Sequence, residues 1–101
     1  MKKLLALYKV PADSDTFMHQ YREAHLPLVN EIPGLIKIEL TRIERTLIGD
    51  PGNFLLAEMF FADAESLNAA MKSPENAAAA ADLTDLAPGI VTVMTGSVLE
   101  D

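Results

Sequence analysis

Two stretches of this sequence are apolar on both faces of the strands that they would form. Residues 3–10 read KLLALYKV and residues 54–61 read FLLAEMFF, where Glu58 is the only charged residue of the second stretch. Successive side chains of a strand point to opposite faces of a sheet, so both faces of such a strand need an apolar cover. Helices packed on one face supply only one cover, and the sequence therefore indicates another layer against the second face.

The length of the chain limits where that second layer can come from. The chain has 101 residues, a length that suffices for one domain. Of these residues, 50% are hydrophobic. A domain of this size buries only about two-thirds of the surface that its unfolded chain exposes. We therefore expect a single domain over residues 1–101 whose second apolar face is covered by another subunit.

The first predicted helix contains a break. Asp13 or Ser14 can cap its start. Pro27 lacks an N–H group and disfavours the helical conformation of the residue before it, so we expect a kink near His25 and a further short turn to Ile32. The inward-facing positions of this helix recur at near-helical spacing: Phe17, Tyr21, His25 and Leu28.

The other elements follow from periodicity and turn residues. Residues 35–43 alternate between apolar and polar side chains, which is typical of a half-buried strand. Asp63 can cap a helix that runs to Met71, and Ser73 followed by Pro74 marks a second helix start. The remaining predicted features are a turn at 49–52, a strand at 54–61, a helix end at 88–89 and a strand at 90–98.

These elements occur in the order β-α-β-β-α-β, with the second helix broken in two. This order predicts an α+β, ferredoxin-like fold, in which an antiparallel sheet carries both helices on one face. The uncovered face then calls for a twofold-related copy, which gives a two-sheet dimeric α/β barrel. We therefore expect a homodimer joined through its sheets.

The strand at 54–61 should divide its side chains between the helices and the partner subunit. Phe61 leads directly into the predicted cap at Asp63 and should lie beneath that helix. By alternation, the helix-facing set is Leu55, Ala57, Met59 and Phe61. The partner-facing set is Phe54, Leu56, Glu58 and Phe60.

Charge and composition argue against several partners and cofactors. The formal net charge is −7 and the eight Lys and Arg residues are scattered, which disfavours nucleic acids and anionic membranes as partners. The chain has no cysteine and only two histidines, and it lacks the glycine-rich loops that bind phosphates. We therefore expect no metal ion and no cofactor. The apolar run near Met1 stops at Lys9, too short for a signal peptide or a membrane span, so we expect a cytoplasmic protein.

One segment resembles a family signature. Residues 21–29 read YREAHLPLV and residues 32–35 read IPGL, and together they resemble the signature of the EthD family, which belongs to the dimeric α/β-barrel superfamily. The similarity continues over essentially the whole chain, through residues 4–8, 57–63, 73–75 and 92–96.

This resemblance implies the ferredoxin-like fold and a pocket between helices and sheet. The family is named for a small protein required for the degradation of ethyl tert-butyl ether alongside a cytochrome P450 system. Relatives in the superfamily include cofactor-free monooxygenases, lactone isomerases, polyketide cyclases and haem enzymes. Because one fold carries many reactions, the resemblance leaves the reaction open.

His25 is the first candidate for a catalytic residue. It lies on the inward-facing stripe of the first helix, and the resemblance places it at the pocket. Imidazole titrates near neutral pH, so His25 could act as a general acid or base on an enolisable or phenolic ligand. The alternative is a structural histidine that hydrogen-bonds a carbonyl group left free by Pro27.

Two further residues are candidates for the same chemistry. Tyr21, one turn before His25, could add a phenol to the pocket or simply pack in the core. Glu58 could be a proton acceptor with a raised pKa, or it could pair with Lys37 or Arg42 across the neighbouring strand.

Four other residues have simpler expected roles. Tyr8 is a possible pocket phenol with core packing as the alternative, and His19 should lie on the surface. Leu47 and Ile48 are apolar residues in a polar connection, so they should either close over the pocket or contact the partner.

Three functions fit these observations. The first is an EthD-like protein that binds a small apolar metabolite, as a cofactor-independent enzyme of oxygenase or isomerase type with proton transfer at a histidine. The second is a non-catalytic dimer that binds a hydrophobic ligand. The third is a haem-handling protein.

Overall fold

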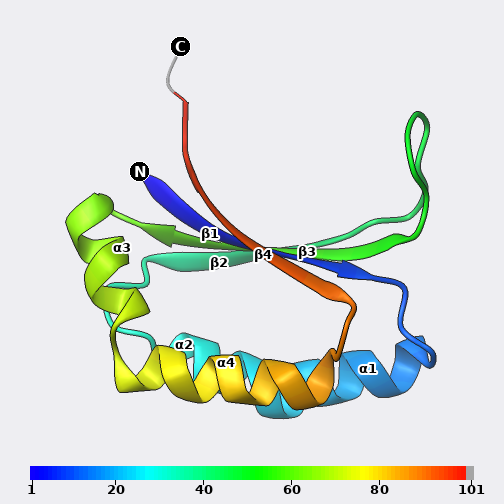
Figure 1. Cartoon of the computed structure of the whole chain (residues 1–101), viewed down its shortest axis with the longest axis horizontal. Coiled ribbons are helices and arrows are strands. Elements are labelled where there is room, and N and C mark those ends of the chain that lie inside the picture. The colour runs from blue at the N-terminus through cyan, green and yellow to red at the C-terminus, as the bar shows by residue number, and fades with distance from the viewer. Residues whose placement is uncertain (100–101) are drawn as a thin grey trace.

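The computed structural model describes residues 1–99 and shows a four-stranded antiparallel sheet with its helices on one side (Figure 1). The strand order is β2-β3-β1-β4, with β1 at Lys2–Lys9, β2 at Lys37–Arg42, β3 at Asn53–Phe61 and β4 at Val91–Ser97. This is the predicted α+β, ferredoxin-like fold. The predicted domain extends to Asp101, and its last two residues lie outside the described part of the chain.

The helices form a single layer against one face of the sheet. Figure 1 shows α1, α2 and α4 running below the sheet, with α3 at one end between β3 and α4. The helical segments are α1 (Ser14–Gln20), the π-helical turn η1 (Tyr21–His25), α2 (Leu26–Asn30), α3 (Ala64–Met71) and α4 (Pro74–Leu86). None of the helices within residues 1–99 is both long enough and apolar enough to span a membrane.

The break in the first helix is the π-helical turn. The N–H of Leu26 donates to the carbonyl oxygen of Tyr21, five residues earlier, whereas an α-helix uses the carbonyl four residues earlier. The wider turn holds one extra residue just before Pro27, which has no N–H to donate. It also moves the most buried position of the stripe by one residue: Val29 is 3% exposed, whereas the predicted Leu28 is half-buried and packs against the edge of the core.

Side-chain caps begin α1, α3 and α4 as predicted. Asp13, Asp63 and Ser73 each accept a hydrogen bond from the backbone N–H three residues further on, at 3.1, 2.8 and 3.1 Å. Each bond satisfies an N–H group that the helix leaves without a partner. Gly34 turns the chain from α2 toward β2 with φ of 82°, a conformation that residues with a Cβ atom rarely adopt.

The pairing of β1 with β3 fixes which side chains face the helices. Leu4 lies opposite Met59 and Ala6 lies opposite Ala57, and all four are buried in the core. The predicted helix-facing set of β3 is confirmed, because every member belongs to this core: Leu55, Ala57, Met59 and Phe61.

Phe54 is the exception, and its predicted position toward a partner is wrong. The register between β1 and β3 shifts after the pair Tyr8 and Leu55, which leaves Phe54 as the extra residue of a β-bulge. Its ring turns toward the helix layer and meets the ring of Phe17 edge-on, with 5.7 Å between the centroids. Simple alternation fails here because it assumes an unbroken strand.

Within the described residues 1–99, no helix or strand covers the sheet face opposite the helices (Figure 1). Four apolar side chains meet on it across three strands: Leu5, Leu7, Leu56 and Met94. Beside them, the ammonium groups of Lys3 and Lys37 lie 4.8 and 4.6 Å from the ring centre of Phe60. This face is the second apolar surface that the two predicted strands require.

Candidate functional site

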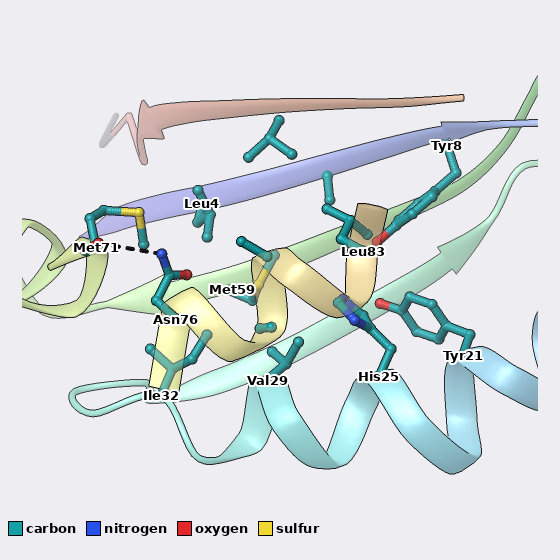
Figure 2. Close-up of a pocket in the computed structure, with 14 residues that line it drawn as sticks. Leu4, Tyr8, Tyr21, His25, Val29, Ile32, Met59, Met71, Asn76 and Leu83 are labelled. Carbon is teal, nitrogen blue, oxygen red and sulfur yellow. Dashed lines mark hydrogen bonds between the residues drawn. The ribbon is translucent and has the colours of Figure 1, made fainter. Parts of the chain in front are cut away.

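A cavity of about 130 Å³ lies between the helix layer and the sheet (Figure 2). We call it the His25 cavity. Val93, which is 51% exposed, belongs to its wall, so the cavity reaches the surface beside β4. Its lining residues come from β1, β3, β4, the π-helical turn η1, α2 and the residues just after it, α3 and α4: Leu4, Ala6, Tyr8, Tyr21, His25, Val29, Ile32, Met59, Met71, Asn76, Ala79, Ala80, Leu83 and Val93.

The polar groups of the lining gather at the two ends of the cavity. Figure 2 shows Tyr8, Tyr21 and His25 together at one end, and Asn76 beside Met71 at the other. The amide nitrogen of Asn76 donates to the carbonyl oxygen of Met71 at 3.4 Å. Aliphatic and methionine side chains form the walls between the two ends.

The π-helical turn brings Tyr21 and His25 to the same end. An α-helix rotates by about 400° in four residues, so side chains four apart drift around its axis. The extra residue of the turn reduces this drift and keeps both rings inward, with 5.3 Å between their centroids. Tyr8 reaches them from β1, with its ring centroid 5.7 Å from that of Tyr21.

His25 is held by a carboxylate from the opposite helix. Its Nδ1 lies 3.0 Å from Oδ2 of Asp82 on α4. The imidazole is 5% exposed and the Asp82 side chain 27% exposed. Burial lowers the pKa of His25 below its usual value, and the nearby Asp82 carboxylate opposes part of that effect. The imidazole is therefore neutral at pH 7 and has a ready stabiliser for an added proton.

Both tyrosines remain protonated at neutral pH. Burial raises the pKa of Tyr21 to about 12, although the neighbouring Tyr8 hydroxyl opposes the effect. Burial also raises the pKa of Tyr8 well above its usual range, and Tyr21 and Asp82 add to the shift. The two phenols can therefore donate hydrogen bonds to a ligand oxygen.

Glu58 does not share the cavity with His25. It lies opposite Leu5, on the sheet face turned away from the helices. It forms an ion pair with Lys3, 2.7 Å from Nζ to Oε2. The predicted pairing with Lys37 or Arg42 is therefore wrong, because the cation comes from β1 on the other side of β3.

The two cations proposed for Glu58 have other neighbours. The Nζ atom of Lys37 lies 3.7 Å from Oε2 of Glu39 on the same strand. Arg42 lies opposite Leu55, at a position on the helix-facing side of the sheet, and its guanidinium is 3.9 Å from the ring centre of Phe54. The bulge at Phe54 supplies the ring on which Arg42 stacks.

The positions of His19, Leu47 and Ile48 bear on three further sequence predictions. His19 is exposed, as predicted. Leu47 and Ile48 are 78% and 95% exposed, and the connection between β2 and β3 that carries them rises on the sheet side away from the helices (Figure 1). They therefore do not close over the His25 cavity.

Asp82 is the residue that the sequence did not point to. It is separated from His25 by 57 positions, so no local spacing links the two. The available signal was its place directly after the alanine run at 77–81, three residues beyond the buried Ala79 and so on nearly the same helix face. A carboxylate beside the inward face of a helix needs a partner.

The cavity therefore combines a base, two phenols and an apolar body. The imidazole can accept a proton and Asp82 can stabilise the imidazolium that results. Among residues 1–99, no group of three or more His, Cys, Asp or Glu side chains is arranged to hold a metal ion. The chemistry that these side chains can perform by themselves is proton transfer.

Comparison with known families matches most of this chain to the EthD domain. The EthD domain model matches residues 9–87. A relative in Rhodococcus erythropolis, an 11.0 kDa protein of the thcB–thcC intergenic region, is 31% identical over 94 residues, which cover 93% of this chain and 91% of the relative.

Solved structures extend the comparison. An ethyl tert-butyl ether degradation (EthD) family protein from Bacillus halodurans is 37% identical, with a TM-score of 0.91 over 98% of this chain and 99% of its own. SnoaB, a cofactor-independent oxygenase from Streptomyces nogalater, is 13% identical, with a TM-score of 0.70 over 99% and 94%. A dimeric ferredoxin-like protein from Bacteroides fragilis is 18% identical, with a TM-score of 0.65 over 96% and 95%. The last two similarities concern the fold alone.

Proposed function

This chain belongs to the EthD family, and from that premise we propose that it is a homodimeric, cofactor-independent enzyme that binds a small apolar metabolite in the His25 cavity and transfers a proton with His25. The observation that carries the proposal is the 3.0 Å contact of Oδ2 of Asp82 with Nδ1 of His25, a residue that lines a mostly apolar cavity. Its EthD-like domain spans residues 1–101.

His25 acts as the general base in this proposal. A base is most effective when its pKa lies near the working pH. Burial alone would make the imidazole too weak a base, and the Asp82 carboxylate restores part of its basicity. When the imidazole takes a proton, the neighbouring carboxylate offsets the new charge in a site that holds little water.

Tyr21 assists His25 by donating a hydrogen bond. The oxygen of a ligand gains negative charge when a base removes its proton, or a proton from a neighbouring carbon. A phenol with a pKa of about 12 stays protonated and can donate to that oxygen. Glu58 has no part in the step, because it lies on the other sheet face.

Two reaction types follow from such a proton transfer. An isomerase returns the proton to a different atom of the same ligand. An oxygenase of this kind uses the electron-rich deprotonated ligand itself to reduce dioxygen. SnoaB is a cofactor-independent oxygenase of the same fold, so this architecture is compatible with chemistry of that type, although fold alone does not assign it.

The homodimer would form through the uncovered sheet face. Leu5, Leu7 and Leu56 are apolar neighbours there, and a two-sheet barrel would remove them from water. The Bacteroides fragilis protein of this fold is described as dimeric. A stable interface of this kind buries about 1,600 Å² in total.

A second function is favoured by the character of the cavity lining. Most of its residues are aliphatic or methionine, and His25 already has Asp82 as a partner. A protein that only stores or delivers a hydrophobic ligand needs no more than this. In that case His25 is a structural residue that joins η1 to α4.

An untargeted ligand screen followed by a variant comparison separates the two functions. Ligands recovered with the native protein are identified by mass spectrometry and incubated with wild type, His25→Ala and the control His19→Ala, which removes an exposed histidine. The enzyme proposal expects turnover by wild type and His19→Ala and at least a 100-fold slower rate for His25→Ala. Equal turnover by all three proteins contradicts it, and binding without turnover supports the storage function.

A further inference from the structure

We propose that the His25 cavity selects a neutral hydroxyaromatic molecule, a phenol with a small apolar ring system, and that His25 and Tyr21 bind its hydroxyl group from two sides. This inference deepens the proposed function and rests on its claim that the cavity is the ligand site.

The Asp82 carboxylate sets the tautomer of His25. An ionised carboxylate can only accept hydrogen bonds, so the 3.0 Å contact with Nδ1 places the proton of a neutral imidazole on Nδ1. The other ring nitrogen, Nε2, then carries a lone pair and can only accept. A ligand group bound at Nε2 must therefore donate a proton.

The free acceptor at Nε2 is available to a ligand. Within residues 1–99, the contact with Asp82 is the one side-chain hydrogen bond of His25, and no buried side-chain nitrogen or oxygen is left without a partner. Nε2 is therefore not sealed in the protein, and His25 itself lines the cavity. The accessible space next to Nε2 is the cavity.

Tyr21 offers the ligand a hydrogen-bond donor, which complements the acceptor at Nε2 of His25. Tyr21 lies beside His25 at the same end of the cavity (Figure 2), and its protonated hydroxyl can donate. A ligand hydroxyl satisfies both neighbours, because it donates to Nε2 and accepts from Tyr21. An ether or ketone oxygen can only accept, and a hydrocarbon does neither, so each leaves a polar group unpaired.

Charge and shape narrow the ligand to a neutral aromatic molecule. The lining contains no Lys or Arg, and the Asp82 carboxylate lies 3.0 Å from His25 in the lining, so an anionic ligand would be repelled. The volume of about 130 Å³ is close to the roughly 150 Å³ of an apolar cavity that accepts benzene. Met59 and Met71 in the wall offer thioether sulfurs, which contact aromatic rings favourably.

The bound phenol also has a defined proton step. The O–H bond breaks and an N–H bond forms at Nε2, so a neutral phenol and a neutral imidazole become a phenolate and an imidazolium. The imidazolium is stabilised by Asp82 and the phenolate by the Tyr21 hydroxyl. The step conserves atoms and charge without any other reactant.

Four probes of similar size test the inference: phenol, anisole, benzene and benzoate. Their binding is followed by the NMR shifts of the methyl groups of Met59 and Met71, which report contact inside the cavity. Phenol should bind wild type roughly tenfold more tightly than anisole, which lacks the hydrogen bond to Nε2, and more tightly still than benzene, which lacks both hydrogen bonds. Benzoate should not bind.

His25→Phe removes the acceptor and keeps an aromatic ring. In this variant the preference for phenol over benzene should fall about tenfold, the effect of the lost hydrogen bond to Nε2, while benzene binding is retained, which also shows that the cavity is intact. Tyr21→Phe, which removes only the donor, should reduce the same preference if His25→Phe fails to fold. Equal binding of phenol and benzene to wild type, or tightest binding of benzoate, overturns the inference and leaves the cavity as the ligand site. If no probe shifts the two methionines, the proposed ligand site is itself wrong.

Discussion

At the scale of single residues, the buried imidazole of His25 determines how the fold responds to acid. The groups that face it are Asp82 on α4, Tyr21 on its own turn and Tyr8 on β1. The tyrosines are neutral over the physiological range, so Asp82 is the one charge among these three that favours the imidazolium. Burial outweighs it, and the pKa of His25 in the folded protein lies below 6.5.

Acid should therefore destabilise the folded protein through His25. The unfolded chain binds a proton at this residue near pH 6.5 and the folded chain only at lower pH, so the unfolded state takes up more protons between the two values. The stabilisation is complete above about pH 6.5 and is lost as the pH falls toward the folded pKa, by at most about 1.4 kcal/mol per pH unit. Urea unfolding at a series of pH values from neutral to about 5 measures the slope of the free energy of unfolding against pH. His25→Phe should lack it, and an unchanged slope in that variant would assign the effect to other groups.

Removal of the Asp82 charge should lower the pKa of His25. In Asp82→Asn the carboxylate that opposes the effect of burial is gone, so the pKa of His25 should fall further below its usual value. A proton NMR titration of the imidazole checks this result. Asp85→Asn, on the same helix and outside the lining of the His25 cavity, is the control and should leave the titration unchanged. A pKa that stays unchanged in Asp82→Asn would show that the two side chains do not interact in solution, and a pKa that rises would contradict the stabilisation of the imidazolium by Asp82.

At the scale of secondary-structure elements, the cap of α4 supports one wall of the cavity. Ser73 Oγ accepts from the Asn76 N–H at 3.1 Å and donates to the Ala70 carbonyl oxygen at 2.6 Å. It therefore fixes both the start of α4 and its junction with α3. Asn76 and Asp82 take their positions from this helix.

Ser73→Ala should destabilise the protein by about 1 kcal/mol, the usual effect of a lost N-cap. Urea unfolding measures the change. Ser73→Asp should recover only the part that is due to the cap, because aspartate accepts from the Asn76 N–H but cannot donate to the Ala70 carbonyl oxygen. Ser97→Ala, at an exposed position of β4, should change stability by less than about 0.5 kcal/mol. An equal loss in Ser73→Ala and Ser97→Ala would mean that the cap contributes nothing of its own.

Local sequence signals were enough to predict the elements. Alternation located β2, and proline, glycine and capping residues located the ends of the helices, because each of these signals acts over a few residues. The same reasoning placed His25 and Tyr21 on the inward face of the first helix. The resemblance to the EthD signature pointed to the same histidine.

Prediction from the sequence failed where a helix or strand departs from its regular period, and where a residue contacts another that is far away in the sequence. The π-helical turn moved the most buried position of the stripe from Leu28 to Val29, and the β-bulge turned Phe54 to the helix side. Both irregularities add one residue to an element, which no periodic pattern reveals. Asp82 depends on a contact between distant segments, which only the tertiary fold supplies.

At the scale of the whole molecule, the uncovered sheet face is the feature that the single chain leaves unexplained. Leu56 lies opposite Leu7 on this face, where the proposed second subunit would cover both. Such an interface should tolerate a charge poorly, because a buried carboxylate without a partner costs several kcal/mol.

Leu56→Asp should therefore dissociate the dimer and lower its stability. Light scattering at micromolar concentration should report a dimer for wild type and a monomer or unfolded chain for the variant. Ala78→Asp adds the same charge at an exposed position of α4 and should remain dimeric. A folded, fully dimeric Leu56→Asp protein would show that the subunits do not meet through this face.

The central claim is that His25 presents a free base to the cavity because Asp82 holds its other nitrogen. Nitrogen-15 NMR of the imidazole tests this claim directly, because the shifts of the two ring nitrogens show which one carries the proton. At neutral pH we expect a neutral ring with the proton on Nδ1 and the lone pair on Nε2, and we expect the Nε2 signal to move when phenol is added. A ring with its proton on Nε2, or one that titrates like an exposed histidine, would contradict the account.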